Sequence, residues 1–157
     1  MSAPGISPAA PPDAFVGASL GTDVLHLSLQ RLVMVAGANR DFAPAHSDSE
    51  AARQGGAPAA FADVIFVFAL FERLLMQWSG PRGRITRMGP LKIKDFLICG
   101  QDVSSTGTIE SVRSVPGPDG VPWGEVMAKI TLSQPDGREP VSGSATILVP
   151  RARGADT

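Results

Sequence analysis

The order of apolar and polar positions divides the chain into a helical N-terminal third, one long apolar segment and a C-terminal half of strands. Over residues 29–36 the apolar positions recur at helical spacing, which predicts a helix with one apolar face. A short strand is expected at 24–29. The helix at 29–36 has Ser28 as its expected N-cap, and Gly37 and Asn39 are expected to end it. A second, short helix is expected to begin at a cap formed by Ser47 or Asp48 and to end at Gly55 and Gly56.

The long apolar segment runs from Phe61 to Trp78. The β-branched and aromatic residues of its first half would also suit a buried strand, but strands rarely run this long, and its second half is rich in helix formers. Asp63 near the start suits the helix macrodipole, and Gly80 followed by Pro81 ends the helix. A helix that is apolar nearly all round should be buried on most faces, so another layer has to wrap it.

The C-terminal half supplies that layer. Its residues are rich in Val, Ile and Thr, and Gly and Pro interrupt them at intervals typical of hairpins. The expected strands lie at 84–94, 101–115, 123–132 and 141–149, with turns at 116–120 and 134–137. The sequence therefore predicts an α+β fold, in which a curled antiparallel sheet surrounds a long central helix.

Size and charge limit the classes of function. A chain of 157 residues predicts one domain, here 14–150, with a disordered segment at 1–13 and a polar tail at 151–157. The formal net charge of −1 gives no reason to expect a nucleic acid or a membrane as partner. The start lacks the features of a signal peptide, and the longest apolar run, 64–71, is too short to span a bilayer. We therefore expect a soluble cytoplasmic protein.

Cysteine and histidine are scarce. The single cysteine, Cys99, excludes a disulfide framework and a Cys-based metal cluster, and its apolar neighbours favour a packing role. With only two histidines in the chain we expect no metal site, and no motif calls for a cofactor. The densest group of cations, Arg82, Arg84 and Arg87, is either a solvated strand end or a contact for a phosphorylated small ligand.

Candidate chemistry lies in the loop at 37–46. His46 follows Asp41 by five positions, with Pro44 between them to stiffen the segment. If the loop folds back, a carboxylate and an imidazole side by side could act as general acid and base, for example in adding water to an activated double bond or removing it. The alternative is that Asp41 caps a turn and His46 lies on the surface. His26, the other histidine, is expected to be structural.

The loop and four later segments together resemble a known family, the MaoC-like (R)-specific enoyl-CoA hydratases and dehydratases. The family's hydratase motif reads roughly Gly, Asp, any residue, Asn, Pro, Ile, His, followed by an acidic helix that ends near glycine. The similar segments are 35–48 with 51–53 and 55–56, 71–81 at the end of the central helix, 100–102 at the start of a strand, and 143–146 in the final strand. The segment 71–81 resembles the end of the central helix in the small MaoC-like subunits of actinobacterial steroid and acyl-CoA degradation.

The resemblance implies a hot-dog fold, a long helix wrapped by an antiparallel sheet, and dimers of like or unlike chains that bind an acyl-CoA thioester near their junction. It implies that Asp41 and His46 form the catalytic pair, which holds and activates water for syn addition to a trans-2-enoyl thioester. It also implies that backbone N–H groups near the start of the central helix, within 56–63, polarise the thioester carbonyl as an oxyanion hole does.

Two departures from the family pattern keep other functions open. Ala43 stands where the motif has Asn, and Ala60–Asp63 replaces a usual His-Gly-Met. The chain could therefore be a non-catalytic hot-dog subunit that stabilises a catalytic partner or binds an acyl thioester. A hot-dog thioesterase would instead use a carboxylate on the central helix, Asp63 or Glu72. The aromatic residues of the helix segment, which could line an acyl pocket or simply form core, are Phe61, Phe66, Phe68 and Phe71.

Overall fold

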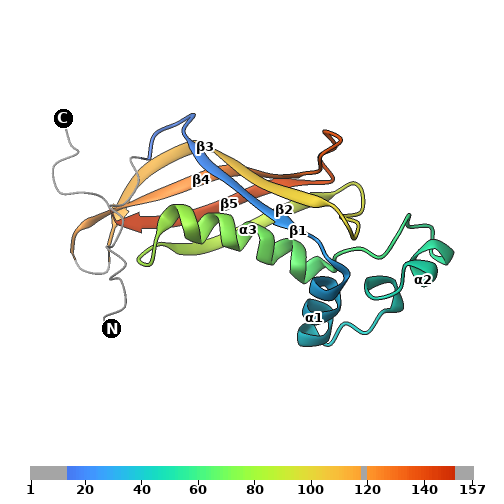
Figure 1. The fold of residues 1–157 in the computed structure, drawn as a ribbon. Coiled ribbons are helices and arrows are strands. Elements are labelled where there is room, and N and C mark those ends of the chain that lie inside the picture. The colour runs from blue at the N-terminus through green and yellow to red at the C-terminus, as the bar shows by residue number, and fades with distance from the viewer. Residues whose placement is uncertain (1–13, 118–119, 151–157) are drawn as a thin grey trace, which may run out of the picture.

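Five strands and one long helix make up most of the fold (Figure 1). A computed structural model describes residues 14–117 and 120–150, so the predicted disordered segment at 1–13 and the tail at 151–157 lie outside the described residues. The elements are β1 (Ser19–His26), α1 (Leu29–Asn39), the 3-10 helix η1 (Pro44–His46), α2 (Ser49–Gln54), α3 (Val64–Ser79), β2 (Arg84–Ile93), β3 (Asp102–Pro116), β4 (Pro122–Ser133) and β5 (Val141–Pro150).

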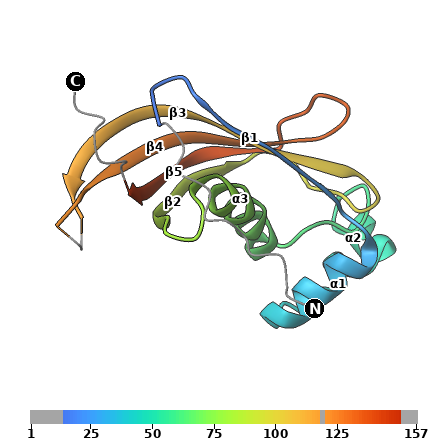
Figure 2. The ribbon, with the colours of Figure 1, turned by 60° about the vertical axis from the view of Figure 1, so that its left-hand side comes forward.

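The strands form one antiparallel sheet in the order β1-β3-β4-β5-β2. Two successive hairpins join β3, β4 and β5, at the turns that the sequence predicts, and the sheet arches over α3 (Figure 2). The core lies between the concave face of the sheet and α3, where Phe71, Val126 and Ile147 are fully buried. The predicted α+β fold, a curled antiparallel sheet around a long helix, is confirmed.

The central helix begins three residues later than predicted. Phe61 forms an isolated antiparallel bridge with Ile98, and the backbone N–H of Ala62 donates to the carbonyl of Leu97 at 2.9 Å. This pairing holds 61–62 extended against the 97–99 segment, so the helix starts only at Val64, with Asp63 as its N-cap. The end is as predicted, because Gly80 follows Ser79 with a positive φ of 70°.

The expectation that α3 is buried on most faces was wrong. The sheet covers one side of the helix, and on the other side Val64, Ile65 and Met76 stay partly exposed, next to the charged Glu72 and Arg73. A single sheet layer can contact only the face turned toward it, so the outer face has no partner within the described chain. None of the described helices combines the length and the hydropathy needed to cross a bilayer. The cytoplasmic location stays a prediction.

The N-terminal elements differ from the predictions at their ends. The first strand lies at Ser19–His26 rather than 24–29, because its position is set by pairing with β3. Helix α1 begins after Ser28 as expected, but it continues through Gly37 to Asn39. Helix α2 follows the predicted cap Asp48, whose side chain accepts from the Glu50 N–H at 2.8 Å, and it ends at Gln54 with Gly55 as its C-cap, as predicted.

Candidate active site

Asp41 is positioned by the way helix α1 ends. Arg40 adopts a left-handed conformation, with φ 59° and ψ 28°, and its N–H donates to the Gly37 carbonyl at 3.2 Å. The N–H of Asp41 then donates to the Ala36 carbonyl at 2.9 Å, which completes a Schellman-type helix end. The Asp41 carboxylate turns back on its own loop, where Oδ1 accepts from the Ala43 N–H at 3.2 Å. The backbone amide at position 43 thus supports Asp41 although the side chain there is only a methyl group.

His46 is held by a main-chain carbonyl. It is the last residue of η1, and its Nδ1 lies 2.8 Å from the carbonyl oxygen of Phe61. Because a carbonyl oxygen only accepts hydrogen bonds, Nδ1 carries the hydrogen, and in the neutral form of the ring the lone pair is at Nε2. The Phe61 ring packs edge-on against the imidazole, with ring centroids 4.9 Å apart.

The two side chains meet, because His46 Nε2 lies 3.4 Å from Asp41 Oδ2. The imidazole is 11% exposed and the carboxylate 40%, so the pair is anchored on the histidine side and open to water or a ligand on the aspartate side. The expected folding back of the loop is therefore confirmed, and the alternative that His46 lies on the surface was wrong. Asp41 does also cap its turn, as that alternative held. The catalytic role of the pair stays a prediction.

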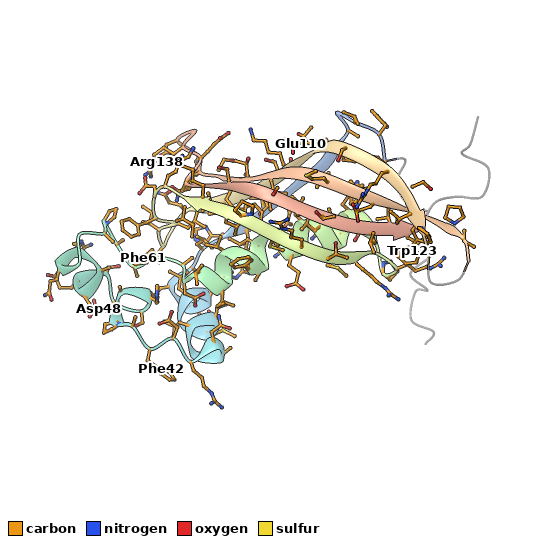
Figure 3. The ribbon with its side chains drawn as sticks, turned by 180° about the vertical axis from the view of Figure 1, so that it is seen from behind. Phe42, Asp48, Phe61, Glu110, Trp123 and Arg138 are labelled. Carbon is orange, nitrogen blue, oxygen red and sulfur yellow. The ribbon has the colours of Figure 1, made fainter. Side chains whose placement is uncertain are left out.

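The segment before α3 is hydrogen-bonded to η1 and to α2, next to the pair. The N–H of Phe61 donates to the Ala45 carbonyl at 3.3 Å, and the N–H of Ala60 donates to Ser49 Oγ at 3.1 Å. The Phe61 ring contacts the Phe96 ring, with centroids 4.6 Å apart. Figure 3 shows Phe61 between the sheet and the α1–α2 region, at the same end of the molecule as Phe42 and Asp48.

The backbone amides near the start of α3 identify where an anionic oxygen could bind. Most N–H groups within 56–63 already donate to acceptors inside the protein; these are the N–H groups of Gly56, Ala57, Ala60, Phe61 and Ala62. In the first turn of α3 the Phe66 N–H donates to Asp63, whereas those of Val64 and Ile65 have no acceptor in the described part of the chain. Within the expected range, the N–H groups of Ala59 and Asp63 likewise have no acceptor in the described part of the chain, so open amides lie both inside that range and just beyond it.

Other predicted candidates fall outside the site. Asp63 caps α3 and is buried, and Glu72 is an exposed residue in the middle of the same helix, so neither carboxylate joins the Asp41–His46 pair. His26 pairs with Asp102, with 2.8 Å between Nδ1 and Oδ1, at the edge of a separate surface pocket of about 370 Å³. The described residues contain no group of three metal-binding side chains.

The arginine group also lies apart from the pair. The guanidinium groups of Arg82 and Arg84 lie over the Trp123 ring, 5.9 Å and 5.6 Å from its centre. Figure 3 shows Trp123 at the opposite end of the molecule from Phe61. Of the four aromatic residues of the long segment, Phe66 and Phe71 are core, whereas Phe61 and Phe68 are only partly buried.

Comparisons with known proteins relate the chain to others through its fold. Neither models of protein families nor curated protein sequences match it. Among solved structures, the ChsH1-ChsH2 complex from Mycobacterium tuberculosis matches with a TM-score of 0.74 and 23% identity, over 87% of this chain and 98% of that one. The (R)-hydratase from A. caviae involved in PHA biosynthesis matches at 0.73 and 19%, over 88% and 98%. A MaoC-like dehydratase matches at 0.73 and 27%, over 92% of this chain but 43% of that one.

Proposed function

Because the chain has the hot-dog fold of the MaoC-like dehydratases and (R)-hydratases, we propose that it adds water to a trans-2-enoyl thioester, such as an enoyl-CoA, or catalyses the reverse dehydration. The observation that carries the proposal is the Asp41–His46 pair, in which the Phe61 carbonyl fixes the proton on Nδ1. In the neutral imidazole this arrangement places the lone pair of Nε2 beside a carboxylate oxygen, and both atoms can accept a hydrogen from one water molecule.

The pair would act on this water as a general base and then as a general acid. As the water oxygen bonds to C3 of the enoyl group, His46 Nε2 accepts the proton that the water loses. The electrons of the double bond move toward the thioester oxygen, which becomes an enolate. The proton then passes from the pair to C2 and the thioester carbonyl reforms. Water is added without oxidation or reduction, and on one face of the double bond, because Asp41 and His46 hold the water on one side.

Charge on the thioester oxygen needs donors, and the open N–H groups of Val64 and Ile65 are suited to this role. They lie at the N-terminus of a 16-residue helix, where the macrodipole favours negative charge. Asp63 occupies the Phe66 N–H and leaves these two free. They would act beside the range 56–63 that the resemblance implies, where the N–H groups of Ala59 and Asp63 are also open.

A second hot-dog chain would complete the site, as homodimer or heterodimer. Phe42 and Met34 are exposed beside the loop, and Val64 and Ile65 are half-exposed at the start of α3. Apolar surface of this kind around an open carboxylate indicates a binding or association face. The ChsH1-ChsH2 structure is itself a complex of two proteins, which supports assembly as the way this surface is covered.

The test is hydration of crotonyl-CoA and longer enoyl-CoA esters by the purified chain, alone and with candidate partner chains. Loss of the absorbance of the conjugated thioester measures turnover. We expect Asp41→Asn and His46→Gln each to lower kcat at least about 100-fold, the usual contribution of an acid or base. The matched control is the other His–Asp pair, since His26→Gln and Asp102→Asn should leave kcat unchanged.

Each alternative has its own outcome. Hydration that survives both Asp41→Asn and His46→Gln would refute the proposal. Release of free CoA would indicate a thioesterase. Activity that appears only with a partner chain and ignores these substitutions would identify this chain as the non-catalytic subunit.

A further inference from the structure

One buried carboxylate near the site has no part in the proposed chemistry. We propose that Asp63, together with Asn39, positions the Asp41–His46 pair by linking the end of α1 to the start of α3. This inference rests on the proposed function, because its effect is defined by the turnover of the same pair.

The two oxygens of Asp63 have different partners. Oδ1 accepts from the Phe66 N–H at 2.6 Å and so caps α3, while Oδ2 lies 3.5 Å from the side-chain nitrogen of Asn39. The residue is only 3% exposed, so both contacts are shielded from water. In the described part of the chain, this is the hydrogen bond that joins α1 to the start of α3.

The positions of the two residues explain why this link matters for the pair. Asn39 is the last residue of α1 and stands two positions before Asp41. Asp63 stands two positions after Phe61, whose carbonyl holds His46. The link therefore connects the supports of both members of the pair, and it ends beside the open amides of α3.

Capping alone does not require a carboxylate. Serine caps a helix about as well as aspartate and avoids the cost of a buried charge. What the carboxylate adds is a second acceptor oxygen, and that oxygen faces Asn39. At 3.5 Å the contact is long, so it adds little to the free energy of unfolding, but it still fixes where the two segments lie, and catalytic hydrogen bonds often shorten when substrate binds.

The test separates capping from bridging. Asp63→Ser keeps an acceptor for the Phe66 N–H and removes the contact with Asn39, and Asn39→Ala removes the same contact from the other side. We expect each to lower kcat about 10- to 100-fold with little change in KM, since small displacements of reacting groups have effects of this size. Asp63→Asn keeps an acceptor for the Phe66 N–H and turns an NH2 group toward Asn39, whose side-chain amide can rotate so that its oxygen accepts; kcat should therefore stay within about threefold of the parent protein.

Coupling between the two positions provides the decisive readout. The double variant Asn39→Ala/Asp63→Ser should be no slower than either single variant, because both remove one interaction. Single variants with parental kcat, or losses that multiply in the double variant, would overturn the inference. Unfolding could also lower kcat in all variants. Assays are therefore made well below the melting temperature of every variant, and circular dichroism measures that temperature.

A readout without turnover distinguishes this inference from the proposed function. The NMR signals of the His46 ring should shift in both single variants and by the same amount in the double variant, while those of His26 stay in place. An inactive parent protein whose His46 signals shift in this way contradicts the hydratase but supports the link. An active parent protein that needs Asp41 but is indifferent to Asn39→Ala contradicts the link alone.

Discussion

The ion pair between Asp23 and Arg73 joins the edge strand β1 to helix α3. Asp23 is 7% exposed; its Oδ1 accepts from Arg73 Nη2 at 3.0 Å and from Gln77 Nε2 at 3.4 Å. Arg73 Nε lies 2.9 Å from Oδ2, close enough for strong attraction although that oxygen makes no well-aligned hydrogen bond. Replacing the arginine should therefore leave a buried carboxylate with one neutral donor.

The size of the effect follows from burial. Removing one partner of a fully buried pair costs about 3–5 kcal/mol, but the Arg73 side chain is 44% exposed and water can partly replace it. We expect Arg73→Met, which keeps the apolar stem, to lower the free energy of unfolding by about 2 kcal/mol. For a chain of this size that corresponds to a melting temperature lower by roughly 4–8 °C.

Urea denaturation followed by circular dichroism measures this change, at two protein concentrations so that any effect of association is visible. The double variant Asp23→Asn/Arg73→Met removes the uncompensated charge and should recover most of the loss. Glu72→Gln, an exposed neighbour on the same helix, should stay within about 0.5 kcal/mol of the parent protein. A loss below about 0.5 kcal/mol for Arg73→Met, or no recovery in the double variant, would refute the reasoning.

Two further predictions concern the sheet and its last hairpin. A methyl group at Gly143 in β5 would lie 2.6 Å from the carbonyl oxygen of Pro90, so Gly143→Ala should lower the free energy of unfolding, measured by urea denaturation, by about 1–3 kcal/mol. Gly37→Ala places a methyl group in open space within α1 and should raise the free energy of unfolding by about 1 kcal/mol. Equal effects of the two substitutions would contradict the packing argument. The pKa of Asp136 lies below its ordinary 3.8 because the backbone N–H and the guanidinium of Arg138 donate to its carboxylate, so its contribution to stability is present above pH 3.8 and is lost as the pH falls through the lower folded value. Arg138→Gln should raise this pKa toward 3.8 in a carbon-13 NMR titration, and an unchanged titration would show that the guanidinium has no effect.

Local signals account for what the sequence predicts well. The turns at 116–120 and 134–137 contain their own Gly and Pro residues, so the strands on either side could be placed to within one or two residues. The start of α3 could not, because Phe61 is held extended by Ile98, which is distant in the sequence. Gly37 likewise suggested a helix end, but the helix continues to Asn39 and ends where Arg40 turns left-handed.

The same distinction applies to the site. Asp41 and His46 could be found because they lie in one loop, whereas the groups that hold them cannot be read from residue types. The anchor of His46 is the carbonyl of Phe61, and every residue type carries a carbonyl. The contact between Asn39 and Asp63 joins positions 24 residues apart, and only the fold brings them together.

Phe61 contacts His46 through both its main chain and its side chain. The carbonyl of Phe61 fixes the imidazole, while the Phe61 ring packs between His46 and Phe96. Any amino acid at position 61 supplies the same acceptor, so evolution or an engineer can change the ring to reshape the surroundings of the pair without loss of the tautomer. Position 61 is therefore a place where the side chain beside the proposed acid/base pair can change while the carbonyl that holds His46 is kept.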